Sequence, residues 1–500
     1  MSDWQKVKLT EIYEISSGLS KPAEAFGSGH PFVSFKNVFR NCFIPDELEQ
    51  LVESTDKERQ KCSVKKGDVF LTRTSETMHE LGMSSVALKD YPYATFNGFT
   101  KRLREKDKHG FDVLPEYIGY YLRSPKFRTG MLAFSTMSTR ASLNNQMISQ
   151  LDIELPPISV QKTIADALKR LDEKIQLNRQ TNQTLEAIAQ AIFKSWFVDF
   201  DPTRAKIAAN ECALARTTGA STVELIAQLL EDGRWTKKQA QTIAQGDPEL
   251  AAMSAISGQF VSAVASKGDE TQEQNPQLTA EKLEELSQTA ALFPSVLVDS
   301  ELGEIPEGWQ WSEIGNEVTV VGGGTPSTKK TEYWDGGTIN WTSPRDMSNL
   351  TDKVLTQTDR QITKEGLAKI SSGLLPVGTV LMSSRAPVGY LAITKIPVAI
   401  NQGYIAMKCE KTLSSEYVVQ WANSVMADIK QRASGTTFAE ISKKNFKIIP
   451  VLVPSEHLVN QYANYASDLY GKISVALNET KMLSESRDLL LPKLLSGDFL

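Results

Sequence analysis

The spacing of apolar residues changes twice along this chain, each time from a strand pattern to a helix pattern. The segments LDIELPPI (151–158) and IPVLVPS (449–455) carry regularly spaced apolar residues and then a proline, which is typical of a β-strand that ends there. After each proline, apolar residues recur at intervals of three and four, the period of a helix that packs along one narrow stripe. The pattern predicts two strands, each followed by a long helix.

The two long helices are expected to pair as a coiled coil. The first should run from about Val160 to Phe197, roughly 55 Å at the usual rise per residue. Asn178 and Asn182 put polar layers into its stripe, and Arg487 interrupts the second stripe; polar layers fix the pairing of a coiled coil. The alternative is that each helix packs on its own globular domain. The predicted seam consists of Ile164, Leu168, Leu171, Ile175, Leu185, Ile192, Leu469, Ile473, Leu483 and Leu490.

The chain also repeats itself. The run DVFLTR, which ends at Arg73, matches TVLMSSR, which ends at Arg385, and YATFNGF around Asn97 matches VAINQGY around Asn401. We therefore predict an α+β fold with two similar mixed α/β domains, joined by two long helices in an antiparallel coiled coil with pseudo-two-fold symmetry. The predicted parts are a first domain (1–158), a first coiled-coil helix (159–200), a helical insert and linker (201–300), a second domain (301–455) and a second coiled-coil helix (456–500).

Composition changes this picture little. Of the 500 residues, 41% are hydrophobic and 23% are charged, which is ordinary for a globular protein. The N-terminal residues have no apolar signal region and no long apolar stretch occurs, so we expect a cytoplasmic protein that is not bound to a membrane. The four cysteines are scattered without CxxC spacing, which favours unpaired thiols and no structural metal.

The net charge of −5 is unevenly distributed. Residues 1–160 carry 21 basic and 20 acidic side chains, and residues 301–460 carry 16 of each, so both predicted domains are close to neutral. Short basic runs, such as Lys101, Arg102, Arg104, Lys106 and Lys108, permit contact with nucleic acid but are equally typical of a solvated face. Near-neutral domains predict weak DNA binding by the chain alone.

Motifs for catalysis are missing from the sequence. The run Gly322–Gly324 lacks the spacing of a phosphate-binding loop, so a glycine turn between strands is the better interpretation. There is no GxSxG or HExxH motif, and no histidine stands beside a suitable partner residue. We expect a chain that is not an enzyme and has no catalytic residue and no metal site.

Four segments resemble a known family, the specificity subunits of type I restriction–modification enzymes. They are FKSWFVDFDP (193–202), ELGEIPEGW (301–309), LLPKLLSGDF (490–499) and the strand end with two prolines. One departure is visible: the family usually has Glu-Gln after the strand-ending proline, whereas here only Gln161 is kept, and the second copy has His457 and Leu458.

The resemblance implies two target recognition domains that read a bipartite, asymmetric double-stranded DNA site, with the coiled coil as spacer. It also implies that two methyltransferase subunits and restriction subunits assemble on this chain. Adenine-N6 methylation with S-adenosylmethionine and ATP-driven cleavage with Mg²⁺ would then belong to those partners, and this chain would bind no cofactor. The 201–300 insert has the composition of a connector or docking surface. The alternatives are a fused pseudo-dimeric enzyme and a pure protein-interaction scaffold.

Candidate reading residues follow the repeated strands, because base readout uses Arg for guanine, Asn or Gln for adenine, and Ser or Thr for adaptable contacts. The matched pairs Arg73/Arg385 and Asn97/Asn401 could instead be structural, with each arginine held by a carboxylate and each asparagine capping a turn. Residues that read different half-sites should also differ between the two domains. The candidates are Arg73, Thr74, Ser75, Asn97, Lys101, Arg102, Thr139 and Arg140 in the first domain, and Ser343, Arg345, Ser384, Arg385, Asn401, Gln402, Thr436 and Thr437 in the second.

Overall fold

The computed structural model divides the chain into two compact units. Unit 1 comprises Met1–Gln176 with Thr480–Leu500, and unit 2 comprises Leu177–Glu479. The structure describes residues 4–75, 80–133, 136–137, 141–265, 279–348, 350–434 and 439–496. Each unit contains one sheet domain and one segment of each long helix, so the units are not simply the two halves of the sequence.

Unit 1 holds the first sheet domain, which runs from β1 to β12. Its main sheet has the strand order β2-β9-β5-β7, and a smaller sheet has the order β4-β3-β8, in which β3 and β8 are parallel. These strands are β2 (Tyr13–Ser17), β9 (Thr100–Glu105), β5 (Val69–Thr72), β7 (Ser84–Val86), β4 (Leu51–Val52), β3 (Phe26–Val33) and β8 (Thr95–Phe96). β1 (Gln5–Lys8) pairs with β12 (Asp152–Leu155). A further small sheet has β11 (Ala141–Ser142) in the middle, with β6 (Thr74–Ser75) on one side and β10 (Thr136–Met137) on the other.

Unit 2 holds the second sheet domain, which runs from β15 to β24. Its main sheet has the order β16-β23-β20-β21-β18, and its smaller sheet has the order β19-β17-β22, in which β17 and β22 are parallel. These strands are β16 (Thr319–Val321), β23 (Tyr404–Lys408), β20 (Val380–Ser383), β21 (Leu391–Thr394), β18 (Val354–Leu355), β19 (Arg360–Ile362), β17 (Ile339–Thr342) and β22 (Ala399–Ile400). β15 (Gln310–Glu313) pairs with β24 (Pro450–Val453).

The two sheet domains share one topology. The order β2-β9-β5-β7 corresponds to β16-β23-β20-β21, and the first and last strands pair antiparallel in both domains. Short helices occupy the same places in both. In the first domain they are α1 (Leu9–Ile12), α2 (Phe35–Arg40), α3 (Asp56–Lys61), α4 (Pro115–Arg123), α5 (Pro125–Ala133) and α6 (Asn145–Ser149), and in the second α13 (Ile314–Glu317), α14 (Pro344–Met347), α15 (Lys364–Leu367), α16 (Ser415–Ser424), α17 (Met426–Gln431) and α18 (Lys443–Lys447). The predicted fold class of two similar α/β domains is confirmed.

Local sequence explains the strands that close each domain. β12 alternates half-buried Asp152 and Glu154 with buried Ile153 and Leu155, and it stops before Pro156, as the alternating pattern predicted. The central strands β5 and β20 are buried along their whole length, because they have a strand on both sides and helices against the sheet. Sequences such as VFLT and VLMS therefore suit the centre of a sheet.

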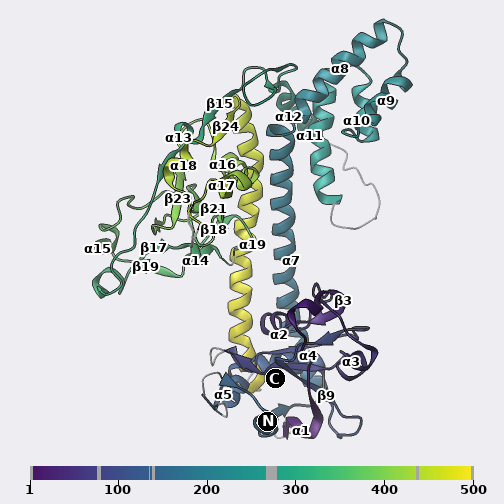
Figure 1. The fold of residues 1–500 in the computed structure, drawn as a ribbon, viewed down its shortest axis with the longest axis vertical. Helices are drawn as coiled ribbons and strands as arrows, with labels where there is room; N and C mark the ends of the chain where they lie inside the picture. Colours follow the sequence, from purple (N-terminus) through teal and green to yellow (C-terminus); the bar gives the residue numbers. More distant parts are fainter. Residues whose placement is uncertain are drawn as a thin grey trace. The chain divides into compact units, whose positions relative to one another are not determined.

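The long helices are α7 (Ile158–Phe197) and α19 (Glu456–Ser496) (Figure 1). In unit 2, Asn178 Nδ2 donates to Glu479 Oε2 (2.7 Å) and the Tyr462 hydroxyl donates to the Ala189 carbonyl (3.3 Å). A later residue of α7 thus pairs with an earlier residue of α19, which shows that the two helices are antiparallel. In unit 1, Arg487 pairs with Asp172 at 2.8 Å, which continues the same antiparallel order.

The predicted seam residues are all buried or half-buried. Ile164, Leu168, Ile175, Ile192 and Ile473 are at least nine-tenths buried. Leu171, Leu185, Leu469, Leu483 and Leu490 are half-buried. Asn178 and Asn182, the two predicted polar layers, are also buried, and Arg487 is accommodated because it forms an ion pair with Asp172.

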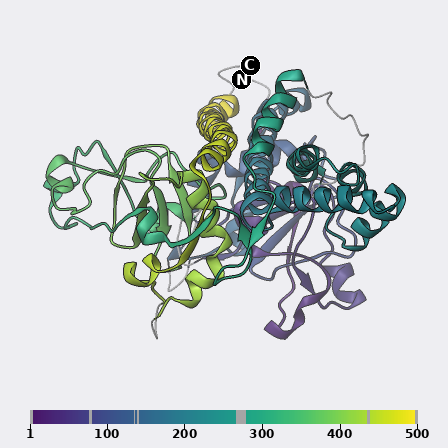
Figure 2. The ribbon, with the colours of Figure 1, turned by 90° about the horizontal axis from the view of Figure 1, so that it is seen from above.

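The insert in unit 2 is helical and has a small core of its own. It contains α8 (Asp201–Thr217), α9 (Thr222–Glu231), α10 (Lys237–Ile243), α11 (Pro248–Ala265) and α12 (Ala280–Ala291), followed by the short strands β13 (Leu297–Val298) and β14 (Ile305–Pro306). Buried residues of α8 to α11, among them Ala209, Leu225 and Ile243, form its core. Figures 1 and 2 show the insert helices and the second sheet domain on opposite sides of the helix pair in unit 2.

All four cysteines are free thiols, and burial raises the pKa of each. The pKa of Cys42 and that of Cys409 are each raised to about 12. Because the thiolate is the reactive form, we expect iodoacetamide at pH 8 to label the native protein slowly and the urea-unfolded protein at once, as measured by mass spectrometry of tryptic peptides. Rapid labelling of native Cys42 or Cys409 would contradict this burial.

Candidate nucleic-acid interface

In the first sheet domain, the ends of three strands meet at Arg73. Its backbone N–H donates to the Phe99 carbonyl, and its carbonyl accepts from the Leu143 N–H, both at 2.8 Å. The N–H of Asn97, just after β8, donates to the carbonyl of Val33 at the end of β3 (3.0 Å). The predicted residues Arg73 and Asn97, which are far apart in sequence, therefore lie on one edge of the domain.

Asn97 and Asn401 have the same structural role. Asn97 Oδ1 accepts from the Phe99 N–H (2.7 Å), and Asn401 Oδ1 accepts from the Gly403 N–H (2.8 Å). Both asparagines thus close a tight turn, the alternative that the sequence left open. Both side chains are half-buried and are held in their turns by these bonds, whereas the neighbouring Gln402 is exposed, so we do not retain either asparagine as a direct reader.

A glycine next to each turn allows two backbones to approach closely. A Cβ at Gly18 would lie 2.3 Å from the Asn97 carbonyl oxygen, and a Cβ at Gly323 would lie 1.9 Å from the Ile400 carbonyl oxygen. The Gly324 N–H donates to that same Ile400 oxygen at 2.9 Å. The run Gly322–Gly324 therefore belongs to an irregular segment after β16 that packs against β22.

Hydrogen bonding corrects one match made by sequence. The residue of the second domain that corresponds to Arg73 is Ser384 and not Arg385. Ser384 makes the same two backbone hydrogen bonds: its N–H donates to the Gly403 carbonyl (2.8 Å), and its carbonyl accepts from the Ile441 N–H (3.0 Å). Arg385 instead corresponds to Thr74, since each pairs with the strand or bridge that follows. The sequence match was shifted by one residue because both segments end in arginine.

The corrected match shows where the two domains differ. At corresponding backbone positions the first domain has Arg73, Thr74, Gly98 and Phe99, and the second domain has Ser384, Arg385, Gln402 and Gly403, in the same order. Arg73, Phe99 and Gln402 are exposed, whereas Ser384 is buried and is no longer a candidate for contact with a base. Phe99 was not among the predicted readers, because sequence comparison searched for hydrogen-bonding side chains.

The prediction for Lys101 and Arg102 is wrong in position, because both point into the domain from β9. Lys101 is 8% exposed and its Nζ donates to Ser17 Oγ (2.9 Å), and Arg102 is 7% exposed and donates to the Ser63 carbonyl (2.6 Å). Burial lowers the pKa of Arg102, and it lowers the pKa of Lys101 together with the nearby charge of Arg73. Both cations are hydrogen-bonded within the sheet domain and are not surface contacts.

The other predicted readers are more varied in placement. Ser343 caps α14 and its Oγ donates to Asp346 Oδ2 (3.1 Å), whereas Arg345 in that helix is exposed. Arg385 lies 3.7 Å from Glu440, the carboxylate partner foreseen as an alternative, and the exposed Gln402 accepts from Thr325 Oγ1 (2.6 Å). Thr74 and Ser75 form β6. Four candidates lie outside the described residues: Thr139, Arg140, Thr436 and Thr437.

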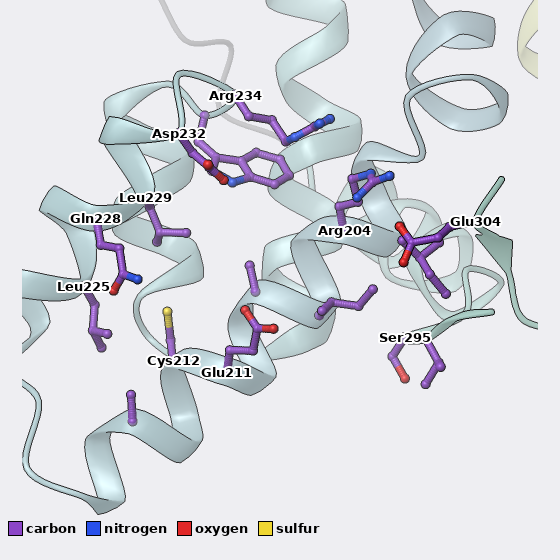
Figure 3. A pocket seen from close by; sticks show the side chains of 16 residues that line it. Arg204, Glu211, Cys212, Leu225, Gln228, Leu229, Asp232, Arg234, Ser295 and Glu304 are labelled. Atoms are coloured by element: carbon purple, nitrogen blue, oxygen red, sulfur yellow. The ribbon is translucent and has the colours of Figure 1, made fainter. Parts of the chain in front are cut away.

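The insert contains a hollow of about 790 Å³ between α8, α9 and the segment before β14 (Figure 3). Arg204, Glu211 and Glu304 line one part of it, and Asp232 and Arg234 line another. Its lining is polar and of mixed charge, which does not favour an apolar cofactor.

Within the described ranges no group of three or more His, Cys, Asp or Glu side chains is placed to hold a metal ion. No described helix combines the length and apolar character needed to span a bilayer.

Comparison with known proteins identifies relatives of the whole chain. The family described as "Type I restriction modification DNA specificity domain" matches residues 1–187 and 306–466, which contain both sheet domains. The specificity subunit of the type I restriction enzyme HindI from Haemophilus influenzae is 29% identical, and the alignment covers 100% of both chains. The MjaIX specificity subunit from Methanocaldococcus jannaschii is 35% identical over 31% of this chain and 37% of its own length. Among solved structures, the S subunit of a type I system from M. genitalium matches with a TM-score of 0.49 and 12% identity over 98% of this chain and 96% of its own.

Proposed function

This chain belongs to the type I restriction–modification DNA specificity family, and from that premise we propose how it performs DNA recognition and complex assembly. It is the specificity subunit: it recognises a DNA sequence and does not itself catalyse a reaction. We propose that its target is bipartite and asymmetric, with one half-site read by each sheet domain. A fused enzyme or a scaffold without DNA preference is not favoured by the family match.

The observation that carries this proposal is the pair of matched strand-end turns. The backbones of the two domains are held by the same hydrogen bonds, but the residues at equal positions differ: exposed Gln402 stands where the first domain has Gly98, and exposed Arg73 stands where the second has Ser384. A shared framework with different exposed groups is suited to reading two different sequences in the same manner. Arg73, Arg345 and Gln402 are exposed and remain the proposed polar readers, with Arg for guanine and Gln for adenine.

The remaining part of the proposal concerns the assembly of the complex. We infer that two methyltransferase subunits and the restriction subunits associate with this chain, and that adenine methylation and ATP-driven cleavage take place in them. S-adenosylmethionine, ATP and Mg²⁺ would bind to those subunits. Helices α7 and α19 each contribute residues to both units, so they join the reading domains, and we propose that they set the separation of the half-sites.

The decisive experiment is a map of methylated adenines in a host genome that expresses the complete system. We expect one recurring site with two different specific parts separated by a fixed number of unspecified base pairs. The Gln402→Ala variant should relax the requirement for one base pair in one part and leave the other part unchanged. A single continuous or palindromic site, or methylation without sequence preference, would show that the two domains do not read separate half-sites.

A further inference from the structure

We propose that Phe99 is a specificity-determining residue whose ring contacts the 5-methyl group of a thymine in the major groove. The proposal rests on the proposed function, because it assumes that the first sheet domain reads DNA. It adds an apolar contact to a site for which the sequence indicated only hydrogen-bonding groups. Thymine is the one base with an apolar group on its major-groove edge, and phenylalanine is among the side chains that contact that methyl group.

The first observation is that an exposed aromatic ring stands on a rigid turn. The Phe99 side chain is 61% exposed. Its N–H donates to Asn97 Oδ1 (2.7 Å), its carbonyl accepts from the Arg73 N–H (2.8 Å), and the next residue, Thr100, donates from Oγ1 to the Asn97 carbonyl (2.7 Å). The backbone is therefore fixed on both sides of the residue, and a ring on a fixed backbone loses little conformational entropy when a partner covers it.

The second observation is that the turn does not need this ring. In the second domain Gly403 occupies the same position, and it makes the same bonds to Asn401 Oδ1 and from the Ser384 N–H. A Cβ at Gly403 would lie 3.0 Å from Pro344 Cγ, so that domain has little room for a side chain there. The two domains therefore differ at this position, as expected if Phe99 reads one half-site only.

The third observation is the neighbourhood of the ring. Arg73, bonded to Phe99 through the backbone, is exposed and carries the guanidinium that suits guanine or phosphate. An isolated exposed apolar residue is common on protein surfaces and has no meaning by itself. Here it adjoins a cationic reader on the edge where three strands end, which places an apolar contact and a polar contact next to each other.

The test uses the complex with its methyltransferase subunits and the duplex obtained from the methylation map. Each thymine of the site is replaced in turn by deoxyuridine, which keeps every hydrogen-bonding group and removes only the methyl group. We expect one replacement to weaken binding by the wild-type complex about fourfold, the effect of one methyl group in an apolar contact. The Phe99→Ala complex should bind the unmodified duplex about as weakly as the wild-type complex binds the deoxyuridine duplex. Its own affinity should not change when that thymine is replaced.

Two further variants make the result specific. Phe99→Tyr keeps the ring, so it should keep the response to deoxyuridine, which shows that loss of the response in Phe99→Ala is not a folding defect. Leu214→Ala removes a 69% exposed apolar side chain from α8 in the insert and should behave as the wild type. If no thymine replacement weakens the wild-type complex, or if Phe99→Ala responds in the same way as the wild type, the proposal is wrong. Failure of the wild-type complex to bind the mapped duplex would instead contradict the proposed function.

Discussion

Addition of the methyltransferase subunits should raise the affinity of this chain for its target duplex at least about a hundredfold. The reason is electrostatic, because affinity for DNA comes largely from cations that neutralise phosphates and release counterions. Residues 1–160 carry 21 basic and 20 acidic side chains, and residues 301–460 carry 16 of each, so neither sheet domain has an excess of positive charge. We therefore expect the methyltransferase subunits to supply most of the phosphate contacts.

Internal hydrogen bonds reduce the available positive charge further. The guanidinium of Arg104 binds both carboxylate oxygens of Asp68, at 2.7 and 2.6 Å, and Arg123 donates to four backbone carbonyls of the first domain. Lys101, Arg102 and Lys106 also donate to groups of that domain. The basic run that was compatible with DNA contact is therefore mostly occupied by the protein itself.

Fluorescence anisotropy with a labelled target duplex measures this effect, with the chain alone and with the reconstituted methyltransferase complex at several salt concentrations. The dissociation constant of the complex should rise more steeply with salt, since each added phosphate contact contributes about 0.9 to the slope of log K against log salt. A duplex with a scrambled site is the control for sequence preference. Tight, sequence-specific binding by the isolated chain would contradict the expectation.

The sequence was informative wherever a period or a proline was involved. The proline after Leu155 marked the end of β12, and the intervals of three and four marked the whole of α7, including the buried Asn178 and Asn182. These features are local or depend on one repeating interval, so they can be read without knowledge of tertiary contacts. The duplication was also visible, because the two domains keep apolar residues at equal places along their strands.

The exact register of the readers could not be obtained in this way. Whether Arg73 corresponds to Ser384 or Arg385 depends on hydrogen bonds to the Phe99 and Gly403 carbonyls, which join residues distant in sequence. The burial of Arg102 depends on a carbonyl at Ser63, which no local pattern indicates. A side chain's type suggests what it can bind, but its direction from a strand decides whether it reaches the surface.

Substitution of Trp196 should have the largest effect on stability. Trp196 is fully buried near the end of α7, in the segment FKSWFVDFDP. Its ring makes edge-to-face contacts with Phe293 after α12 and with Tyr462 and Tyr465 of α19, at centroid distances of 5.2, 6.1 and 5.9 Å. One side chain thus joins α7 to α19 and to the segment that follows α12, so Trp196→Ala would leave a large cavity between them. We expect a loss of about 3–5 kcal/mol in the free energy of unfolding.

Urea unfolding followed by circular dichroism measures this loss without relying on the fluorescence of the removed residue. Trp311→Ala is the matched control, because Trp311 is 38% exposed and its Nε1 donates to Ser300 Oγ (3.1 Å), so we expect a loss of about 1 kcal/mol or less. Trp196→Phe should lie between the two, because it keeps an aromatic ring and removes an indole N–H that has no acceptor among the described residues. If Trp196→Ala is no more destabilising than Trp311→Ala, the junction of α7, α12 and α19 does not depend on this ring. The helix pairing in unit 2 would then have to rest on the remaining contacts, chiefly those of Phe193 and Phe197 with Tyr417 and Tyr462.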